Sequence, residues 1–502
     1  MTRRSCAIYG VGIVCASLLI IGIGLVVTQV FQTLIHNRLK KEITLTEGSR
    51  VFETWKNPPP PVFMQYFFFN VTNPDDFLVG AKPIVSQVGP YTYREYRPKE
   101  NVTFVDNGTR VSAYQPKTFV FLPERSVGDP DYDMITTINI PAVAVMNKVK
   151  DSFWKSSMVS IWMNSLHVGM LMTRSVNELL WGFKDPLLSR IHPMNPEIDE
   201  YFGLMYKKNG SNDGEFVYHT GEEDFMNYGR VATFKGESKL SLWTSEQSNM
   251  INGTDGSAFH PLLSKTERLY IFSPDLCRSI FMEFEKDVKV KGLPAYRFTP
   301  PRDVLASKEE NPANEGFCVS PKECLGTGLL KVSVCRKGAP VVMSFPHFYL
   351  GDEKYSNAIE GLDPVREHHQ TYLDLNPVHN PVVKTKFLNE TIFPVMFINE
   401  TVVIDDVSAA KLHKLLLTAM LVSNSPLVLV GLGAILLPVF IGLIVCEYKQ
   451  KMAVTTLPDV HSSVPISFSM RRHRRIENTV ELKCNGILLL KERMDQNTAW
   501  LL

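Results

Sequence analysis

Two long runs without a charged residue, one near each end of the chain, most constrain what this sequence can fold into. The first is AIYGVGIVCASLLIIGIGLVVTQVF, residues 7–31, and the second is PLVLVGLGAILLPVFIGLIVC, residues 426–446. About 20 apolar residues suffice to cross the hydrocarbon core of a bilayer, so each run is long enough to span it. Two spans at opposite ends place both termini on one side of the membrane and residues 32–425 on the other.

An alternative for the first run is the apolar core of a cleaved signal peptide. Its uncharged stretch is longer than such a core, and no small-x-small cleavage pattern ends it, so a retained anchor fits better. The second run contains Pro438, which transmembrane helices accept more readily than soluble helices do. Both runs are therefore predicted to be membrane-spanning helices.

Potential glycosylation sites indicate which side of the membrane the large middle segment occupies. The tripeptide N-x-S/T occurs only between the two runs, at Asn70, Asn101, Asn107, Asn209, Asn252, Asn389 and Asn399. Such acceptors are typical of secreted or lumenal surfaces, and the basic run RRHRR near the C-terminus is typical of the cytoplasmic side. We therefore expect a cytoplasmic N-terminus at 1–6, a lumenal or extracellular domain at 32–425, and a cytoplasmic tail at 447–502 that is disordered in isolation.

The cysteines agree with an oxidising compartment for this domain. Its four cysteines, Cys277, Cys318, Cys324 and Cys335, lie in one short region and should form two disulfides, for which three pairings are possible. A structural zinc site is the rival, but the region has no C-x2-C spacing. Cys6 and Cys446 lie at the membrane boundary, where acylation and an inert apolar role are both open.

The stretch SFWKSSMVSIWMNSL, residues 152–166, is predicted to be a helix with an unusual apolar side. At helical spacing, one side carries Trp154, Met158, Ile161, Trp162 and Leu166, with Phe153 next to it, while serines and Asn164 lie opposite. The polar side has almost no charge. Such a helix either lies inside a core or presents an apolar face to a partner.

The rest of the domain reads mostly as strands and turns, with a few helices. Strands are expected in the β-branched and aromatic stretches 117–123, 132–141, 217–221 and 330–335. Helices are expected after the first span and in 145–170, 175–183 and 401–421, the last of which leads into the second span.

Catalytic and nucleic-acid-binding signals are weak. The sequence contains no G-x-S-x-G, no H-E-x-x-H and no P-loop, and its net charge of +1 gives no electrostatic signature for nucleic acid. A metal site is suggested by the neighbouring Glu367, His368 and His369, but a solvated turn explains them better. The loop NGSNDGEF resembles a calcium loop, but Thr220 stands where the bidentate glutamate belongs. We expect a chain that is not an enzyme and that binds neither a metal nor a cofactor.

Several longer motifs resemble one family, the class B scavenger receptors. They are QYFFFNVTNPDDF (65–77), VGPYTYREYRPK (88–99), ELLWGFKDPLL (178–188), NMINGTDGSAFHP (249–261), GLPAYRF (292–298) and SFPHFYLGDEKY (344–355). Their order, their spacing and the two-span layout match that family along nearly the whole domain. Within the family, residues 314–349 are most similar to a lysosomal member that sorts acid β-glucocerebrosidase.

The resemblance implies an α+β fold: a large antiparallel β-barrel-like domain crossed by an apolar tunnel, with a helical bundle at the membrane-distal end. It also implies disulfides between Cys277 and Cys335 and between Cys318 and Cys324. The helix in 152–166 falls in the ligand-binding bundle, which favours its reading as an exposed docking face. His167, just beyond it, is the nearest group able to titrate in an acidic organelle.

The same resemblance implies partners and a location. The expected partners are a lysosomal enzyme of the acid β-glucocerebrosidase type, lipids such as cholesterol, phospholipid or fatty acid, and a second copy in a homodimer. The expected location is the lysosomal or late endosomal membrane, with cell-surface uptake of lipoproteins or fatty acids as the alternative.

The sequence departs from the family pattern in two places. Between YLDLNP (372–377) and IFPVMFINET (392–401) the family carries a longer passage that supplies core strands, and residues 378–391 are short for that purpose. The tail is long, and Asp495 lies too far from Leu501 and Leu502 for an acidic di-leucine signal. We therefore expect an incomplete barrel. The tail also supports a lysosomal location less strongly than the lumenal domain does.

Overall fold

The computed structural model describes residues 3–30, 33–34, 37, 42–318, 324–336, 338–376, 393–402 and 404–455. The chain divides into two compact units. One is Leu25–Ser425, and the other joins Met1–Gly24 with Pro426–Leu502. The segment 378–391, the sequon at Asn389 and the tail beyond residue 455 lie outside the described residues.

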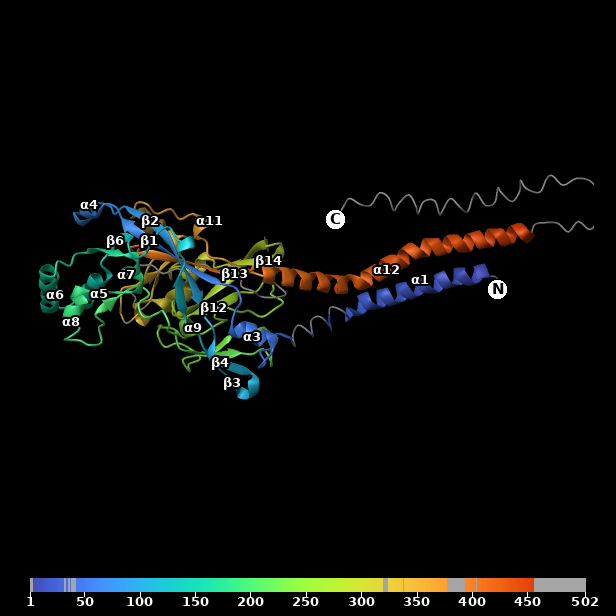
Figure 1. Cartoon of the computed structure of the whole chain (residues 1–502), viewed down its shortest axis with the longest axis horizontal. Coiled ribbons are helices and arrows are strands. Elements are labelled where there is room, and N and C mark those ends of the chain that lie inside the picture. Colours follow the sequence, from blue (N-terminus) through green and yellow to red (C-terminus); the bar gives the residue numbers. More distant parts are fainter. Residues whose placement is uncertain are drawn as a thin grey trace, which may run out of the picture. The chain divides into compact units, whose positions relative to one another are not determined.

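Helices are present in the predicted regions 145–170, 175–183 and 401–421, the first of which is divided between two helices, and additional short helices lie in the loops. The bounds are α1 Arg3–Thr28, α3 Arg50–Lys56, α4 Pro74–Leu78, α5 Ile140–Val149, α6 Phe153–Ser165, α7 Val176–Trp181, α8 Pro186–Ile191, α9 Glu246–Asn249, α10 Glu353–Asn357, α11 Arg366–His369 and α12 Asp406–Thr455. Within the unit Leu25–Ser425, the helices α5, α6 and α8 lie together at one end of the sheets (Figure 1).

The described strands form three antiparallel four-stranded sheets and three small two-stranded ones. The first has the order β18-β1-β2-β5, with β1 Val62–Val71, β2 Val85–Tyr96, β5 Thr118–Phe121 and β18 Met396–Val402. The second, β11-β10-β4-β3, is built from β3 Glu100–Val105, β4 Arg110–Tyr114, β10 Glu215–His219 and β11 Val231–Phe234. The third, β12-β13-β14-β17, is built from β12 Leu269–Ser273, β13 Arg278–Val290, β14 Leu293–Thr299 and β17 Leu373–Leu375.

The two-stranded sheets join β6 Met134–Ile138 to β7 Leu171–Ser175, β8 Phe183–Lys184 to β9 Tyr201–Phe202, and β15 Leu330–Lys331 to β16 Val342–Met343. The strands predicted in 117–123, 132–141 and 217–221 are confirmed. The strand predicted over 330–335 is wrong after Lys331, because Ser333–Cys335 turns into a 3₁₀-helix whose last residue is tied to Cys277.

Each large sheet buries one face under aromatic and branched side chains. In β1, buried side chains alternate with half-buried ones, and Tyr66 and Phe68 are fully enclosed. Helix α7 packs against this sheet through Leu179 and Leu180, and it begins with a capping box in which the Ser175 and Glu178 side chains each accept a backbone N–H. The mixed α+β class is thus confirmed. A closed barrel and a tunnel remain expectations from the family resemblance.

The unit made of the two chain ends is a pair of long apolar helices. Both α1 and α12 are long and apolar enough to cross a membrane, and their most apolar windows are only 11% and 6% buried. The core helix of a soluble protein would instead be mostly buried. Helix α12 also includes the segment predicted to lead into the second span, since it begins at Asp406 and runs on without a break to Thr455.

Small residues bring α1 and α12 close together. A Cβ atom added at Gly12 would lie 2.5 Å from the ring of Phe440, and one added at Gly433 would lie 2.7 Å from Leu19. At the same contact the thiol of Cys15 donates to the carbonyl oxygen of Gly433 across 3.2 Å. Small side chains allow this approach in membranes, where packing and hydrogen bonds hold helices together.

Candidate functional site

Helix α6 is held by one buried face. Val159 is its most enclosed residue, at 3% exposure, and it packs in a cluster with Val145 of α5 and Leu187 of α8. The sequence favours this arrangement because Asn139 and Asp185 cap the starts of α5 and α8 by accepting backbone N–H groups through their side chains. The apolar contacts of this buried face with α5 and α8 therefore fix the position of α6.

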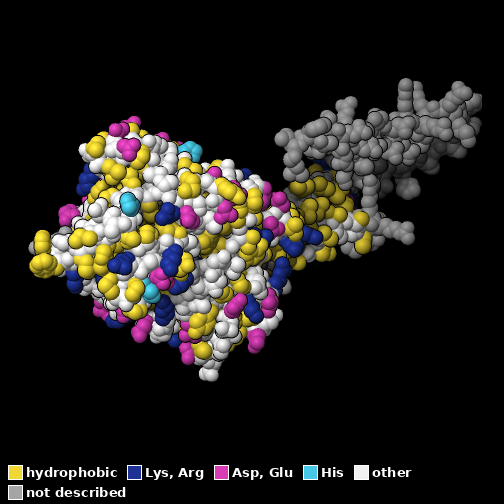
Figure 2. Space-filling model, turned by 60° about the vertical axis from the view of Figure 1, so that its left-hand side comes forward, with side chains coloured by type: hydrophobic (Ala, Val, Ile, Leu, Met, Phe, Trp, Pro, Cys, Tyr) yellow, Lys and Arg dark blue, Asp and Glu magenta, His cyan; other side chains and the backbone are white. Residues whose placement is uncertain are grey.

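The opposite side of α6 is apolar and open to solvent. The exposed fractions are 74% for Phe153, 81% for Trp154, 43% for Met158 and 67% for Ile161. We call these four residues the α6 patch. Figure 2 shows hydrophobic side chains on the surface of this unit with basic side chains among them. The structure thus places four of the seven predicted binding residues together on one accessible surface.

Trp162 and Leu166 do not belong to that surface. Both are half-buried, and Trp162 packs into the cluster under α6 with the guanidinium of Arg190 5.9 Å from its ring centre. The prediction that Trp162 shares the open face of Trp154 is wrong. Trp162 follows Trp154 by eight residues, which in a helix amounts to two full turns plus about 80°. Its side chain therefore points about 80° away from that of Trp154, toward the edge of the exposed face.

His167, the seventh predicted residue, lies just after α6. It is exposed, and its backbone has a φ of 54°, in the left-handed region. Its backbone N–H donates to the carbonyl of Asn164 across 3.2 Å and so closes the end of the helix. Its imidazole is accessible beside the last turn.

The potential glycosylation sites differ in accessibility. Asn101, Asn107 and Asn209 are exposed, whereas Asn70, Asn252 and Asn399 are half-buried. The amide nitrogen to which a glycan would attach is engaged at Asn399, where it donates to the side-chain oxygen of Gln65 across 2.8 Å.

This difference leads to a prediction about glycan occupancy. Single Asn→Gln changes at Asn101 and Asn209 should each increase gel mobility by one glycan, while Asn399→Gln should change it least, because a glycan there would break the contact with Gln65. Immunoblots before and after glycosidase treatment measure this. A full shift for Asn399→Gln would show that this strand admits a glycan.

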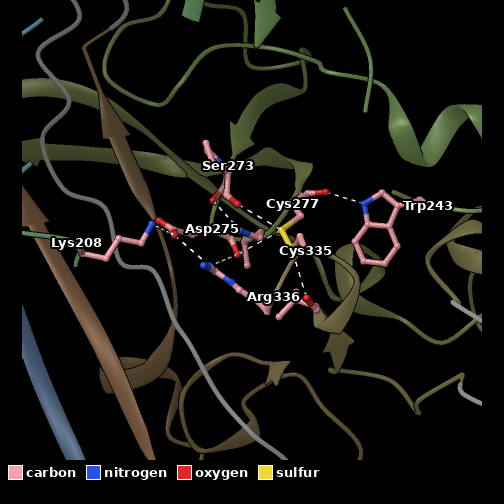
Figure 3. Close-up of a disulfide and its surroundings, with 10 residues drawn as sticks. Lys208, Trp243, Ser273, Asp275, Cys277, Cys335 and Arg336 are labelled. Atoms are coloured by element: carbon pink, nitrogen blue, oxygen red, sulfur yellow. Dashed lines mark hydrogen bonds and ion pairs between the residues drawn. A yellow bond between two sulfur atoms is a disulfide. The ribbon is translucent and has the colours of Figure 1, made fainter. Parts of the chain in front are cut away.

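Two disulfides stabilise the loops of the third sheet. They join Cys277 to Cys335 and Cys318 to Cys324, which is the pairing implied by the family resemblance. Figure 3 shows the first bond, with the indole of Trp243 donating to the carbonyl oxygen of Cys277 across 2.6 Å. The first disulfide and the hydrogen bond from Trp243 both hold Cys277, which directly precedes β13.

The carboxylate of Asp275 lies beside the first disulfide and is matched by cations. Arg336 donates to Asp275 across 3.1 Å, and the ammonium of Lys208 lies 3.4 Å from the same oxygen (Figure 3). Burial alone would raise the pKa of Asp275, but Lys117, Lys208 and Arg336 outweigh it and hold the pKa well below its usual value. Its negative charge is therefore already compensated.

The structure gives other roles to the residues that weakly suggested metal binding. His369 is not part of a solvated turn: it is buried, its ring stacks on His347 at 4.1 Å, and its Nδ1 accepts the backbone N–H of Val365. Asp213, in the loop that resembles a calcium loop, pairs with Lys117 and Lys208. Among the described residues, no group of three or more His, Cys, Asp and Glu side chains is arranged to hold a metal ion.

A sheet-rich domain between two bilayer-length helices, with a solvent-exposed apolar patch, is the layout of a membrane-anchored binding protein. The family model described as "CD36 family" matches residues 13–386. Lysosome membrane protein 2 of Homo sapiens is 41% identical over 458 residues, which cover 88% of this chain and 94% of that protein. Scavenger receptor class B member 1 of Cricetulus griseus is 38% identical over 372 residues, which cover 73% of this chain and 71% of that protein.

The chain therefore belongs to the CD36 family, and the predicted resemblance to the class B scavenger receptors is confirmed. Membership in this family of membrane receptors supports a receptor role.

Proposed function

We propose that the chain is a non-enzymatic receptor whose lumenal domain, residues 32–425, binds a lysosomal enzyme of the acid β-glucocerebrosidase type and delivers it to lysosomes. The observation that carries the proposal is the α6 patch: apolar side chains exposed on a helix whose other face is packed. An exposed apolar patch of this kind suits an interface that a partner covers. Tryptophan is enriched at binding hot spots, and methionine adapts to irregular partners.

The proposed destination rests on similarity. Lysosome membrane protein 2 carries that location in its name, and its match covers nearly its whole length. Delivery by such a receptor also requires release in an acidic organelle. His167 is an accessible imidazole next to the α6 patch, and we propose that it contributes to this release.

A binding experiment tests the proposal. The full chain, purified from membranes in detergent, is mixed with acid β-glucocerebrosidase at neutral and at acidic pH, and the bound enzyme is quantified. We expect retention at neutral pH and release at acidic pH. Absence of binding at both pH values would refute the cargo assignment. Hydrolysis of lipid esters or glycosides by the receptor alone would point to an enzyme instead.

A second candidate function is cell-surface uptake of lipoproteins, or transfer of lipid through a tunnel in the domain. The observation that favours it is the 38% identity to scavenger receptor class B member 1. In this reading cholesterol, phospholipid or fatty acid occupies an apolar cavity, held mostly by apolar contact. A homodimer is compatible with either function.

The lipid proposal leads to a prediction about the short segment 378–391. Inserting a passage of family length there should raise both the melting temperature and the amount of lipid that copurifies, because added core strands would close sheet edges. Thermal unfolding and mass spectrometry of extracted lipids measure the two effects. If neither the melting temperature nor the amount of bound lipid changes, the short segment does not limit the stability of the core or its capacity for lipid.

A further inference from the structure

Arg278, the first residue of β13, is a buried cation with no ion-pair partner among the described residues. It is 5% exposed, and burial lowers the pKa of its guanidinium to about 9. A guanidinium still keeps its proton at physiological pH, so the positive charge stays in place. An isolated charge inside a protein is unfavourable unless it is paired.

The contacts of Arg278 leave most of its donors unused. Its Nε donates to the backbone oxygen of Ser279 across 3.3 Å, and its central carbon lies 3.6 Å from the ring centre of Phe317. Among the described residues, no carboxylate forms an ion pair with it. The nearby carboxylate of Asp275 already faces Lys208 and Arg336.

Arg278 is one of the residues that line a small pocket of about 30 Å³, which is partly open to solvent. The cavity is bounded by the Cys318–Cys324 disulfide and by the segment around Leu305. Its polar lining includes Ser307, Lys308 and Asn314. The ionisable side chains in the described lining, apart from the disulfide cysteines, are Arg278, Lys308 and Lys331, and all three are basic.

We propose that this cavity binds a phosphate group. A guanidinium offers a planar fork of N–H donors that suits oxyanions, and hydrogen bonds between charged groups are the strong ones. Lys308 adds a second positive charge, which a doubly charged phosphate balances better than a carboxylate does. The phosphate can belong to a soluble phosphomonoester or to a lipid headgroup, and both sources present the same chemistry to Arg278.

The experiment uses the full chain in detergent and measures melting temperature and affinity. The probes are inorganic phosphate, glycerol phosphate, acetate, and phosphatidylcholine vesicles with or without phosphatidic acid. Binding of the free phosphates identifies a soluble ligand, and binding of the phosphatidic acid vesicles alone identifies a headgroup. Arg278→Met should weaken binding by about 10- to 100-fold, the value of a charged hydrogen bond.

Two further measurements make the assignment falsifiable. Without phosphate, Arg278→Met should melt at the wild-type temperature or above, because it removes an unpaired buried charge. Arg268→Met is the matched control: it removes an exposed arginine that pairs with Glu283, and phosphate binding should persist. The proposal is overturned if no phosphate probe binds, if acetate binds equally well, or if Arg278→Met melts much lower, which would reveal a partner within the chain.

Discussion

The substitution Trp154→Lys is expected to weaken cargo binding by about 30-fold or more while leaving the fold intact. Trp154 is 81% exposed, so a lysine there meets water and costs the folded domain little. In the complex the same lysine would be desolvated at the centre of an apolar interface. Loss of a central aromatic anchor commonly costs about 2 kcal/mol or more, which corresponds to that loss of affinity.

Two other variants separate binding from folding. Tyr132→Lys introduces the same charge at an equally exposed aromatic residue, 80% accessible and outside α6, and should leave cargo binding unchanged. Trp162→Ala removes a ring that packs under α6, so it should lower the melting temperature. Affinity and thermal unfolding of the three purified variants measure both effects. A fall in melting temperature for Trp154→Lys equal to that for Trp162→Ala would place Trp154 in the interior.

The sequence predicts the existence of α6 better than it predicts the face that α6 exposes. Helical spacing grouped Trp154 with Trp162, but the boundary between packed and open sides depends on where α5 and α8 lie. Val159 forms the packed face together with Met163, and neither residue stands out in the sequence from the apolar residues around it. Only the tertiary contacts separate the two sides.

Local sequence was sufficient where a single strong pattern decided the structure. The uncharged end segments and the strand at 132–141 are examples: length decided the first, and a composition rich in β-branched and aromatic residues decided the second. The burial of His369 and Arg278 could not be predicted from local sequence in the same way. His369 looked like part of a polar turn, and its stacking partner His347 is distant in the chain. The cavity beside Arg278 likewise depends on the fold of several loops.

The substitution Asp255→Asn is expected to lower the free energy of unfolding by about 3–5 kcal/mol, because it leaves a buried cation unpaired. The ammonium of Lys99 is 3.9 Å from the carboxylate of Asp255, and their side chains are 1% and 7% exposed. The same ammonium lies 4.8 Å from the ring centre of Trp55. Gln115 and Tyr218 also donate to this carboxylate, so asparagine would disturb both hydrogen bonds and charge.

Asp287→Asn is the matched control. Asp287 pairs with Lys265 across 2.7 Å, but this pair is on the surface, with side chains 64% and 44% exposed. Surface pairs of this kind contribute about 0–1 kcal/mol, so the control should stay close to wild type. Urea denaturation of the full chain in detergent, followed by tryptophan fluorescence, measures both variants. An equal decrease in the free energy of unfolding for the two variants would mean that burial of the ion pair does not determine how much stability is lost.

The pH dependence of this loss follows from the pKa of Asp255. Burial alone would raise that pKa, but Lys99 and the hydroxyl and amide of Ser257 lower it more, so it lies below its usual value. A carboxylate with a lowered pKa contributes stability that is fully present above its unfolded pKa, about 3.9, and that is lost as the pH falls through the folded pKa. The difference between wild type and Asp255→Asn should therefore be the same at neutral pH and at about pH 5. It should shrink only in stronger acid, so the pair would persist in an acidic organelle where cargo is released.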